Sequence, residues 1–124
     1  MFAGLTMLFL LSACEYDWVE PEKIPVDPGD TLGNIDTVSY AAKIQPIWDQ
    51  GCNVSGCHSN SGFAPNLVAG KSYGELINGG YVNTGTPTES SIYKVMKTGS
   101  MSSYSTSTKN ALVLKWIQQG AKNN

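Results

Sequence analysis

The chain has 124 residues, and its eight basic and ten acidic side chains give a formal net charge of −2. This length has room for one domain with a modest core. It contains no arginine and no run of basic residues, so nothing in its composition favours nucleic-acid binding.

The first 13 residues form an apolar run that ends in Leu-Ser-Ala and is followed by Cys14. The run is too short to cross a bilayer as a stable helix. It resembles a bacterial lipobox, in which small residues precede a cysteine that is lipidated and becomes the mature N-terminus. Residues 1–13 are therefore expected to be a lipoprotein signal segment. Lipid on Cys14 would anchor the protein in the bacterial cell envelope, facing the periplasm or the cell surface. The alternative is an ordinary apolar helix with an incidental cysteine.

Residues 14–36 differ in composition from the remainder of the chain. They carry three prolines and seven acidic residues against one lysine, and they show neither a helical nor a strand period. This pattern predicts an acidic, extended tether whose ends lie about 25–30 Å apart on average. The folded domain is then expected over residues 37–124.

The start and stop signals in residues 37–124 are those of helices. A helix is expected over 40–50, with Pro46 either breaking it or opening its second half. A loop over 59–70 precedes a short helix over 72–77. Thr86-Pro87-Thr88-Glu89 reads as a capping box that opens a helix ending near Gly99. A last helix runs from about Thr106 to Gly120. No alternating strand pattern occurs, so the sequence predicts an all-α fold class.

The segment from Cys52 to His58 carries the clearest chemical signal. Two cysteines precede a histidine that directly follows the second of them, the order required for c-type haem attachment. Each thiol can form a thioether to a haem vinyl group, and the imidazole of His58 can bind the iron. Four residues separate the cysteines instead of the usual two. The extra residues must loop out, and Gly51 and Gly56 give the backbone that freedom.

Two other uses of these residues stay open. A Cys52–Cys57 disulfide would close a very short loop, which stabilises little, and it would leave His58 unexplained. A structural zinc site needs four ligands. Only two cysteines and one histidine are available here, and the adjacent Cys57 and His58 are awkward ligands for one tetrahedral ion.

Over about residues 38–122 the chain resembles a small, single-haem cytochrome c domain of bacterial envelope lipoproteins. The resemblance implies a cytochrome c fold, in which short helices wrap around one covalently attached haem c. It also implies that the first and last helices cross, with Trp48 packed near Trp116. The matching segments are Cys52 to His58, Ala64-Pro65-Asn66-Leu67, Gly99-Ser100-Met101 and Leu114 to Ala121.

The resemblance also implies the surroundings of the haem. The carbonyl of Pro65 is expected to accept a hydrogen bond from His58, and Leu67 belongs to the same haem-contacting segment. Met101 is the expected second iron ligand, with Met96 or an open position as the alternatives. The family usually has Met-Pro-Pro at this loop, whereas this chain has Met101-Ser102-Ser103. The less rigid loop would weaken the iron–sulfur bond.

These features predict a membrane-tethered one-electron carrier with His/Met ligation rather than an enzyme, since the sequence shows no catalytic motif. Residues 37–124 carry seven lysines against three carboxylates, a net of about +4. This charge favours acidic redox partner proteins. The alternative is that the lysines only make exposed helix faces soluble. One alternative is a haem protein with an open or labile distal site, which binds a small gas or reduces peroxide. Another is a non-haem lipoprotein with a disulfide.

Overall fold

The computed structural model describes residues 37–124. The predicted signal segment over 1–13, the lipidation site Cys14 and the acidic tether over 14–36 lie outside the described residues. Between residues 37 and 124 every regular element is helical and no strand occurs, which confirms the all-α class. No helix within this part of the chain is long and apolar enough to cross a membrane.

The first helical stretch consists of two segments, the π-helical η1 (Tyr40–Ile44) and α1 (Gln45–Asp49). The side chain of Ser39 caps η1 by accepting a hydrogen bond from the backbone N of Ala42 at 3.2 Å. Pro46 lies in the first turn of α1, where its missing N–H costs no helical hydrogen bond. The predicted helix over 40–50 is thereby confirmed, with Pro46 opening its second half.

After α1 come three further α-helices: α2 (Ser72–Asn78), α3 (Ser91–Lys97) and α4 (Ser107–Gln118). Two short 3-10 turns, η2 (Pro87–Glu89) and η3 (Ser102–Tyr104), precede α3 and α4. The side chain of Thr106 caps α4 by accepting from the backbone N of Lys109 at 3.2 Å. The predicted helices that begin at Ser72 and near Thr106 are confirmed.

The predicted capping box at Thr86 is wrong. The Thr86 side chain makes no capping hydrogen bond, and the Glu89 carboxylate pairs with Lys94 at 3.1 Å. The helix breaks at Ser90, whose hydroxyl accepts from the backbone N of Asn83 at 2.9 Å and donates to its carbonyl at 3.3 Å. These two bonds hold Ser90 outside the helix, so η2 and α3 are separate elements.

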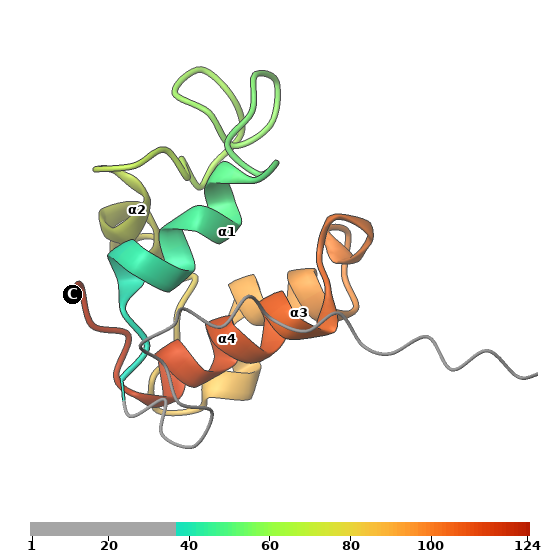
Figure 1. Ribbon diagram of the computed structural model, residues 1–124. Coiled ribbons are helices and arrows are strands. Elements are labelled where there is room, and N and C mark those ends of the chain that lie inside the picture. Colours follow the sequence, from blue (N-terminus) through green and yellow to red (C-terminus); the bar gives the residue numbers. More distant parts are fainter. Residues whose placement is uncertain (1–36) are drawn as a thin grey trace, which may run out of the picture.

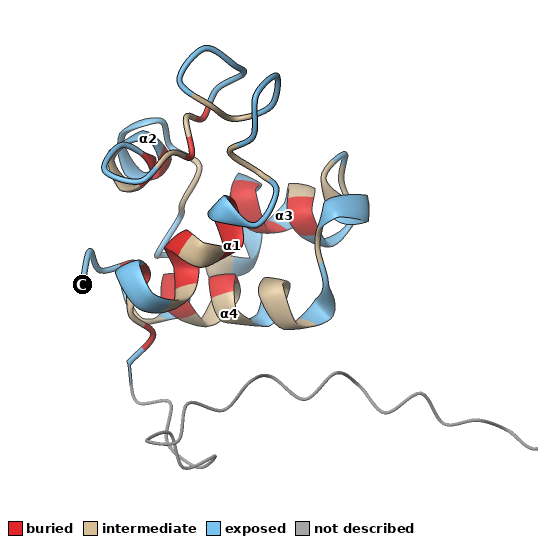
Figure 2. Cartoon of the chain, turned by 45° about the horizontal axis from the view of Figure 1, so that its top comes forward, coloured by how far each residue is buried: buried red, intermediate tan, exposed pale blue. Residues whose placement is uncertain are grey.

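The core lies where the first helical stretch, α3 and α4 meet, and the buried residues gather there in Figure 2. The ring of Tyr40 lies 5.2 Å from the ring of Trp116 and 5.2 Å from the ring of Tyr73, measured between centroids. The fully buried Trp48 joins this group through a hydrogen bond from its indole N–H to the Tyr40 hydroxyl at 3.3 Å. Tyr40 therefore takes part in the contact between the first and last helical stretches.

Figure 1 shows the arrangement of the helices and of the long loop between α1 and α2. The helices α3 and α4 lie side by side, and the segment between α1 and α2 projects beyond the end of α1. The chain end returns beside η1, where the backbone N of Ala41 donates to the carbonyl of Asn124 at 2.9 Å. The projecting loop region thus faces α3, and a cavity lies between them.

Candidate functional site

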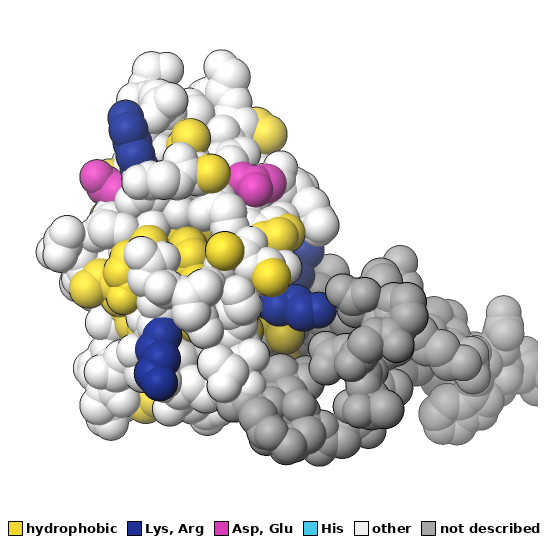
Figure 3. Space-filling view, turned by 60° about the vertical axis from the view of Figure 1, so that its left-hand side comes forward, with side chains coloured by type: hydrophobic (Ala, Val, Ile, Leu, Met, Phe, Trp, Pro, Cys, Tyr) yellow, Lys and Arg dark blue, Asp and Glu magenta, His cyan; other side chains and the backbone are white. Residues whose placement is uncertain are grey.

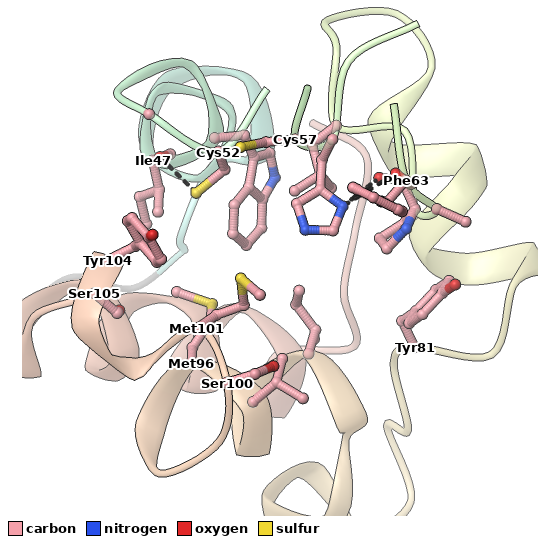
Figure 4. A pocket seen from close by; sticks show the side chains of 18 of the residues that line it. Ile47, Cys52, Cys57, Phe63, Tyr81, Met96, Ser100, Met101, Tyr104 and Ser105 are labelled. Atoms are coloured by element: carbon pink, nitrogen blue, oxygen red, sulfur yellow. Dashed lines mark hydrogen bonds between the residues drawn. The ribbon is translucent and has the colours of Figure 1, made fainter. Parts of the chain in front are cut away.

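The cavity measures about 480 Å³ and has the end of α1 with its following loop on one side and α3 with its following turn on the other. Pockets for small molecules and cofactors typically measure about 300–1,000 Å³. Met96 lines this cavity. So do all six residues that were predicted to contact a cofactor, namely Cys52, Cys57, His58, Pro65, Leu67 and Met101. The structure therefore brings together residues that span 50 positions of the sequence (Figure 4).

The cysteine segment continues directly from α1. The backbone N of Cys52 donates to the carbonyl of Trp48 at 2.9 Å, so the last helical turn sets the position of the first thiol. The chain then reverses, and the N–H of His58 donates to the carbonyl of Cys52 at 3.0 Å. Gly51 and Gly56 have φ of +139° and +82°, a region that favours glycine. The four intervening residues thus form a loop that returns the second cysteine and the histidine to the first.

Both thiols are free and lie on the same wall of the cavity (Figure 4). Cys57 is exposed and Cys52 is partly buried. Burial raises the pKa of the Cys52 thiol, and the nearby positive charge of Lys109 opposes this effect in part. Within residues 37–124, no group of three or more histidine, cysteine or acidic side chains lies close enough to bind one metal ion. The zinc alternative therefore lacks a ligand set in the described part of the chain.

The imidazole of His58 is oriented by two backbone carbonyls. Its Nδ1 lies 3.0 Å from the carbonyl oxygen of Pro65 and 3.2 Å from that of Phe63. A carbonyl oxygen can only accept, so Nδ1 carries the proton and donates it. The lone pair is then on Nε2, which is available to a metal. The predicted contact between His58 and Pro65 is present.

One residue of this loop was not identified from the sequence. A Cβ placed on Gly62 would lie 1.8 Å from the carbonyl oxygen of Cys57. The adjacent N–H of Phe63 donates to that same oxygen at 2.7 Å. Only glycine allows this approach, because any side chain would push the loop away from Cys57. In the sequence Gly62 has no feature beyond its place in a loop.

The opposite wall carries two thioether sulfurs. Met96 lies on α3, and Met101 begins the turn after it; both face the cavity across from the two thiols (Figure 4). The backbone N of Met101 donates to the carbonyl of Val95 at 3.0 Å. A Cβ on Gly99 would lie 2.6 Å from the Cα of Val95, so glycine permits the turn to close onto α3. Met101 is partly exposed, whereas Met96 is only 5% exposed.

The remaining lining of the cavity is mostly apolar, and two aromatic side chains at its rim are exposed. Phe63 is 73% exposed and Tyr104 is 68% exposed. Exposed apolar surface beside a preformed cavity is typical of a ligand site. The cavity therefore combines two thiols, one nitrogen lone pair and two thioether sulfurs around an apolar interior.

The lysines of the domain lie on its surface. On the face shown in Figure 3 they are spread out, and hydrophobic side chains form a band between them. Lys94 pairs with Glu89 at 3.1 Å, and the ammonium of Lys97 lies 5.5 Å from the centre of the Tyr93 ring. Both contacts are at exposed lysines, where such interactions contribute little to stability.

Comparison of the chain with protein-family models, with curated proteins and with solved structures gave no match. The function is therefore inferred from the cavity and its donor groups.

Proposed function

We propose that the protein is a membrane-tethered c-type cytochrome that carries single electrons. One haem would be attached through Cys52 and Cys57, with iron between His58 and Met101. The observation that carries this proposal is one apolar cavity lined by both thiols, the imidazole and two thioethers, in which the thiols and the thioethers lie on opposite walls. The cytochrome c fold, with short helices around that haem, is part of the proposal.

The two cysteines suit attachment because both thiols are free and line the cavity. In this reaction each S–H adds across one vinyl group. A carbon–sulfur bond forms, the hydrogen ends on the neighbouring carbon, and no external oxidant or reductant is consumed. The exposed Cys57 is accessible to an assembly apparatus. The raised pKa of Cys52 keeps its thiol protonated at neutral pH.

The surroundings of two side chains support His58 and Met101 as the residues that would bind the iron. The hydrogen bond from Nδ1 of His58 to Pro65 at 3.0 Å fixes the tautomer and makes Nε2 a better donor to iron. A thioether ligand from Met101 raises the potential relative to two nitrogen ligands. Met101 is favoured over Met96 because it begins a turn, whereas the Met96 side chain packs in the core. Bound haem would supply a reversible one-electron couple, and the apolar walls would keep water from it.

The residues at the cavity fit this cofactor in size and chemistry. The volume of about 480 Å³ is that of a pocket for a cofactor. Its apolar lining matches a macrocycle that is apolar over most of its surface. A group that fills the cavity would also cover part of Phe63 and Tyr104, whose rings are exposed at the rim.

The location and partners are proposed from the sequence. Lipid on Cys14 would hold the domain at the cell envelope through the tether over 14–36. Residues 37–124 carry a net charge of about +4, which would attract acidic redox proteins and make the encounter sensitive to salt.

A potentiometric titration followed by visible absorption tests the carrier role. We expect one reversible one-electron transition, and a reduced spectrum that carbon monoxide does not change. A reduced spectrum that shifts with carbon monoxide would contradict a closed His/Met site. It would support the second candidate, an open or labile distal position for gas binding or peroxide reduction. The observation that favours this second candidate is that Met101 is partly exposed and precedes a turn with two serines in place of rigid residues.

A further inference from the structure

Gln45 is a polar side chain buried beside the cavity wall. It begins α1 and is 9% exposed. Its Nε2 donates to the carbonyl of Leu67 at 3.1 Å and to the carboxylate of Asp49 at 3.0 Å. Its Oε1 accepts a hydrogen bond from the hydroxyl of Ser72. Both amide protons and the carbonyl are therefore used, each toward a different part of the chain.

The hydrogen bonds continue from Ser72 into the core. The Tyr40 hydroxyl donates to Ser72 Oγ at 2.7 Å, and it accepts from the indole N–H of Trp48 at 3.3 Å. Burial raises the pKa of the Tyr40 hydroxyl, which keeps it protonated and able to donate. Four side chains thus form one satisfied chain of hydrogen bonds that starts at a tryptophan lining the cavity and ends at Gln45.

This chain is connected to the histidine through Leu67. The carbonyl of Leu67 accepts from Gln45 at 3.1 Å, and its N–H donates to the carbonyl of His58 at 2.8 Å. Pro65, whose carbonyl orients the imidazole, lies two residues before Leu67. The amide of Gln45 therefore fixes the loop on which the hydrogen-bond acceptor of His58 is placed.

Packing alone does not require an amide at this position. A leucine has a similar size and would avoid the desolvation of a buried polar group. A fully satisfied polar network instead holds its members in one arrangement, and a partly satisfied one is costly. The amide is thus suited to fix geometry rather than to add stability.

We infer that Gln45 is a positioning residue for His58, which acts through Leu67 to hold the Pro65 carbonyl against Nδ1. This inference rests on the proposed haem function for its effect on the iron, but the His58–Pro65 geometry can be measured with or without haem. A weaker bond from Nδ1 makes Nε2 a poorer donor. The reduced iron is then favoured, and the reduction potential rises.

The test compares Gln45→Leu with the unmutated protein in two measurements. The first is the solvent exchange rate of the His58 Nδ1 proton by ¹⁵N-resolved NMR, on reduced protein if haem is present. Of the three hydrogen bonds that this variant removes, the one to Leu67 constrains the loop of His58, and its loss should accelerate exchange about tenfold. The second is the reduction potential, which should rise. Ser72→Ala removes the donor to Gln45 Oε1 and the acceptor of the Tyr40 hydroxyl, but it leaves the hydrogen bond from Gln45 to Leu67 in place. It should therefore shift the exchange rate and the potential in the same direction by less.

Ser90→Ala is the matched control. Ser72 and Ser90 are both 1% exposed, but Ser90 bonds to Asn83 and not to the network of Gln45. The control should lose stability and leave exchange and potential unchanged. The inference is overturned if Gln45→Leu changes neither the exchange rate nor the reduction potential. If Gln45→Leu does not fold, the inference is overturned when Ser72→Ala changes neither quantity. If the unmutated protein carries no haem, the proposed function fails, and the exchange rate alone decides the role of Gln45.

Discussion

Replacement of Gly62 by alanine should disrupt the loop that holds His58. The new Cβ would lie 1.8 Å from the carbonyl oxygen of Cys57, whereas ordinary contact begins at 3.4 Å. The loop must move by roughly 1.6 Å and lose the 2.7 Å hydrogen bond from Phe63 to Cys57. One lost hydrogen bond costs about 1 kcal/mol, and overpacking adds about 1–3 kcal/mol. The expected loss of unfolding free energy is therefore about 2–4 kcal/mol.

Thermal unfolding followed by circular dichroism measures this loss. In a domain of this size each kcal/mol lowers the melting temperature by about 4–8 °C, so Gly62→Ala should lower it by at least about 8 °C. Gly85→Ala is the control, because a Cβ there would meet only the Asn83 side chain, at 3.4 Å, and its φ is not positive. The reasoning fails if the two variants melt within about 3 °C of each other.

In the haem-loaded protein, Met101→Ala should remove the far-red band of methionine-to-iron charge transfer and lower the reduction potential. Met96→Ala should retain the band but lower the unfolding free energy by about 2–3 kcal/mol. This loss lies in the lower part of the range usual for a buried methionine replaced by alanine, because the side chain, although only 5% exposed, also borders the cavity. Loss of the band in Met96→Ala and its retention in Met101→Ala would assign the iron-binding sulfur to Met96. Cys14→Ser should move the protein from the membrane fraction to the soluble fraction without a change in its spectrum, and unchanged retention would place the anchor elsewhere. Burial raises the pKa of Tyr40 above the ordinary 10.0, so its contribution to stability is present below pH 10 and is lost as pH rises further. In Tyr40→Phe the unfolding free energy should therefore fall less steeply with pH above pH 10 than in the unmutated protein. An equal dependence on pH in the two proteins would show that the pKa of Tyr40 is the same in the folded and unfolded states.

The helices that could be predicted are those specified by neighbouring residues. Pro46 in the first turn of α1 and the side chain of Thr106 at the start of α4 each act within one helical turn. The expected helix start near Thr106 is present, and of the two roles open to Pro46 the structure shows the one that opens the second half of the helix. The capping box at Thr86 has an equally good local pattern, but Ser90 bonds to Asn83 seven residues away and breaks the helix there. A contact outside the local window decided that boundary, so the spacing alone predicted the wrong helix.

Some residues of the candidate site could be predicted from the sequence, and others depend on contacts that only the fold creates. The cysteines and His58 are marked by their spacing, and a resemblance to a family was enough to select Pro65 and Met101. Gly62 could not be identified, because the oxygen that it approaches belongs to a residue brought near by the fold. The role proposed for Gln45 was equally hidden, since its partners come from three segments of the chain.

The intact mass of the protein under denaturing conditions tests the central claim most directly. The protein should be produced together with a cytochrome c assembly apparatus, since both thioethers depend on it. We expect a mass increased by one haem that persists after unfolding and acid extraction, and that is absent from a variant with both Cys52→Ala and Cys57→Ala. An unmutated protein with the mass of its polypeptide alone, or with lipid alone, would contradict covalent haem attachment and with it the proposed electron-carrier function.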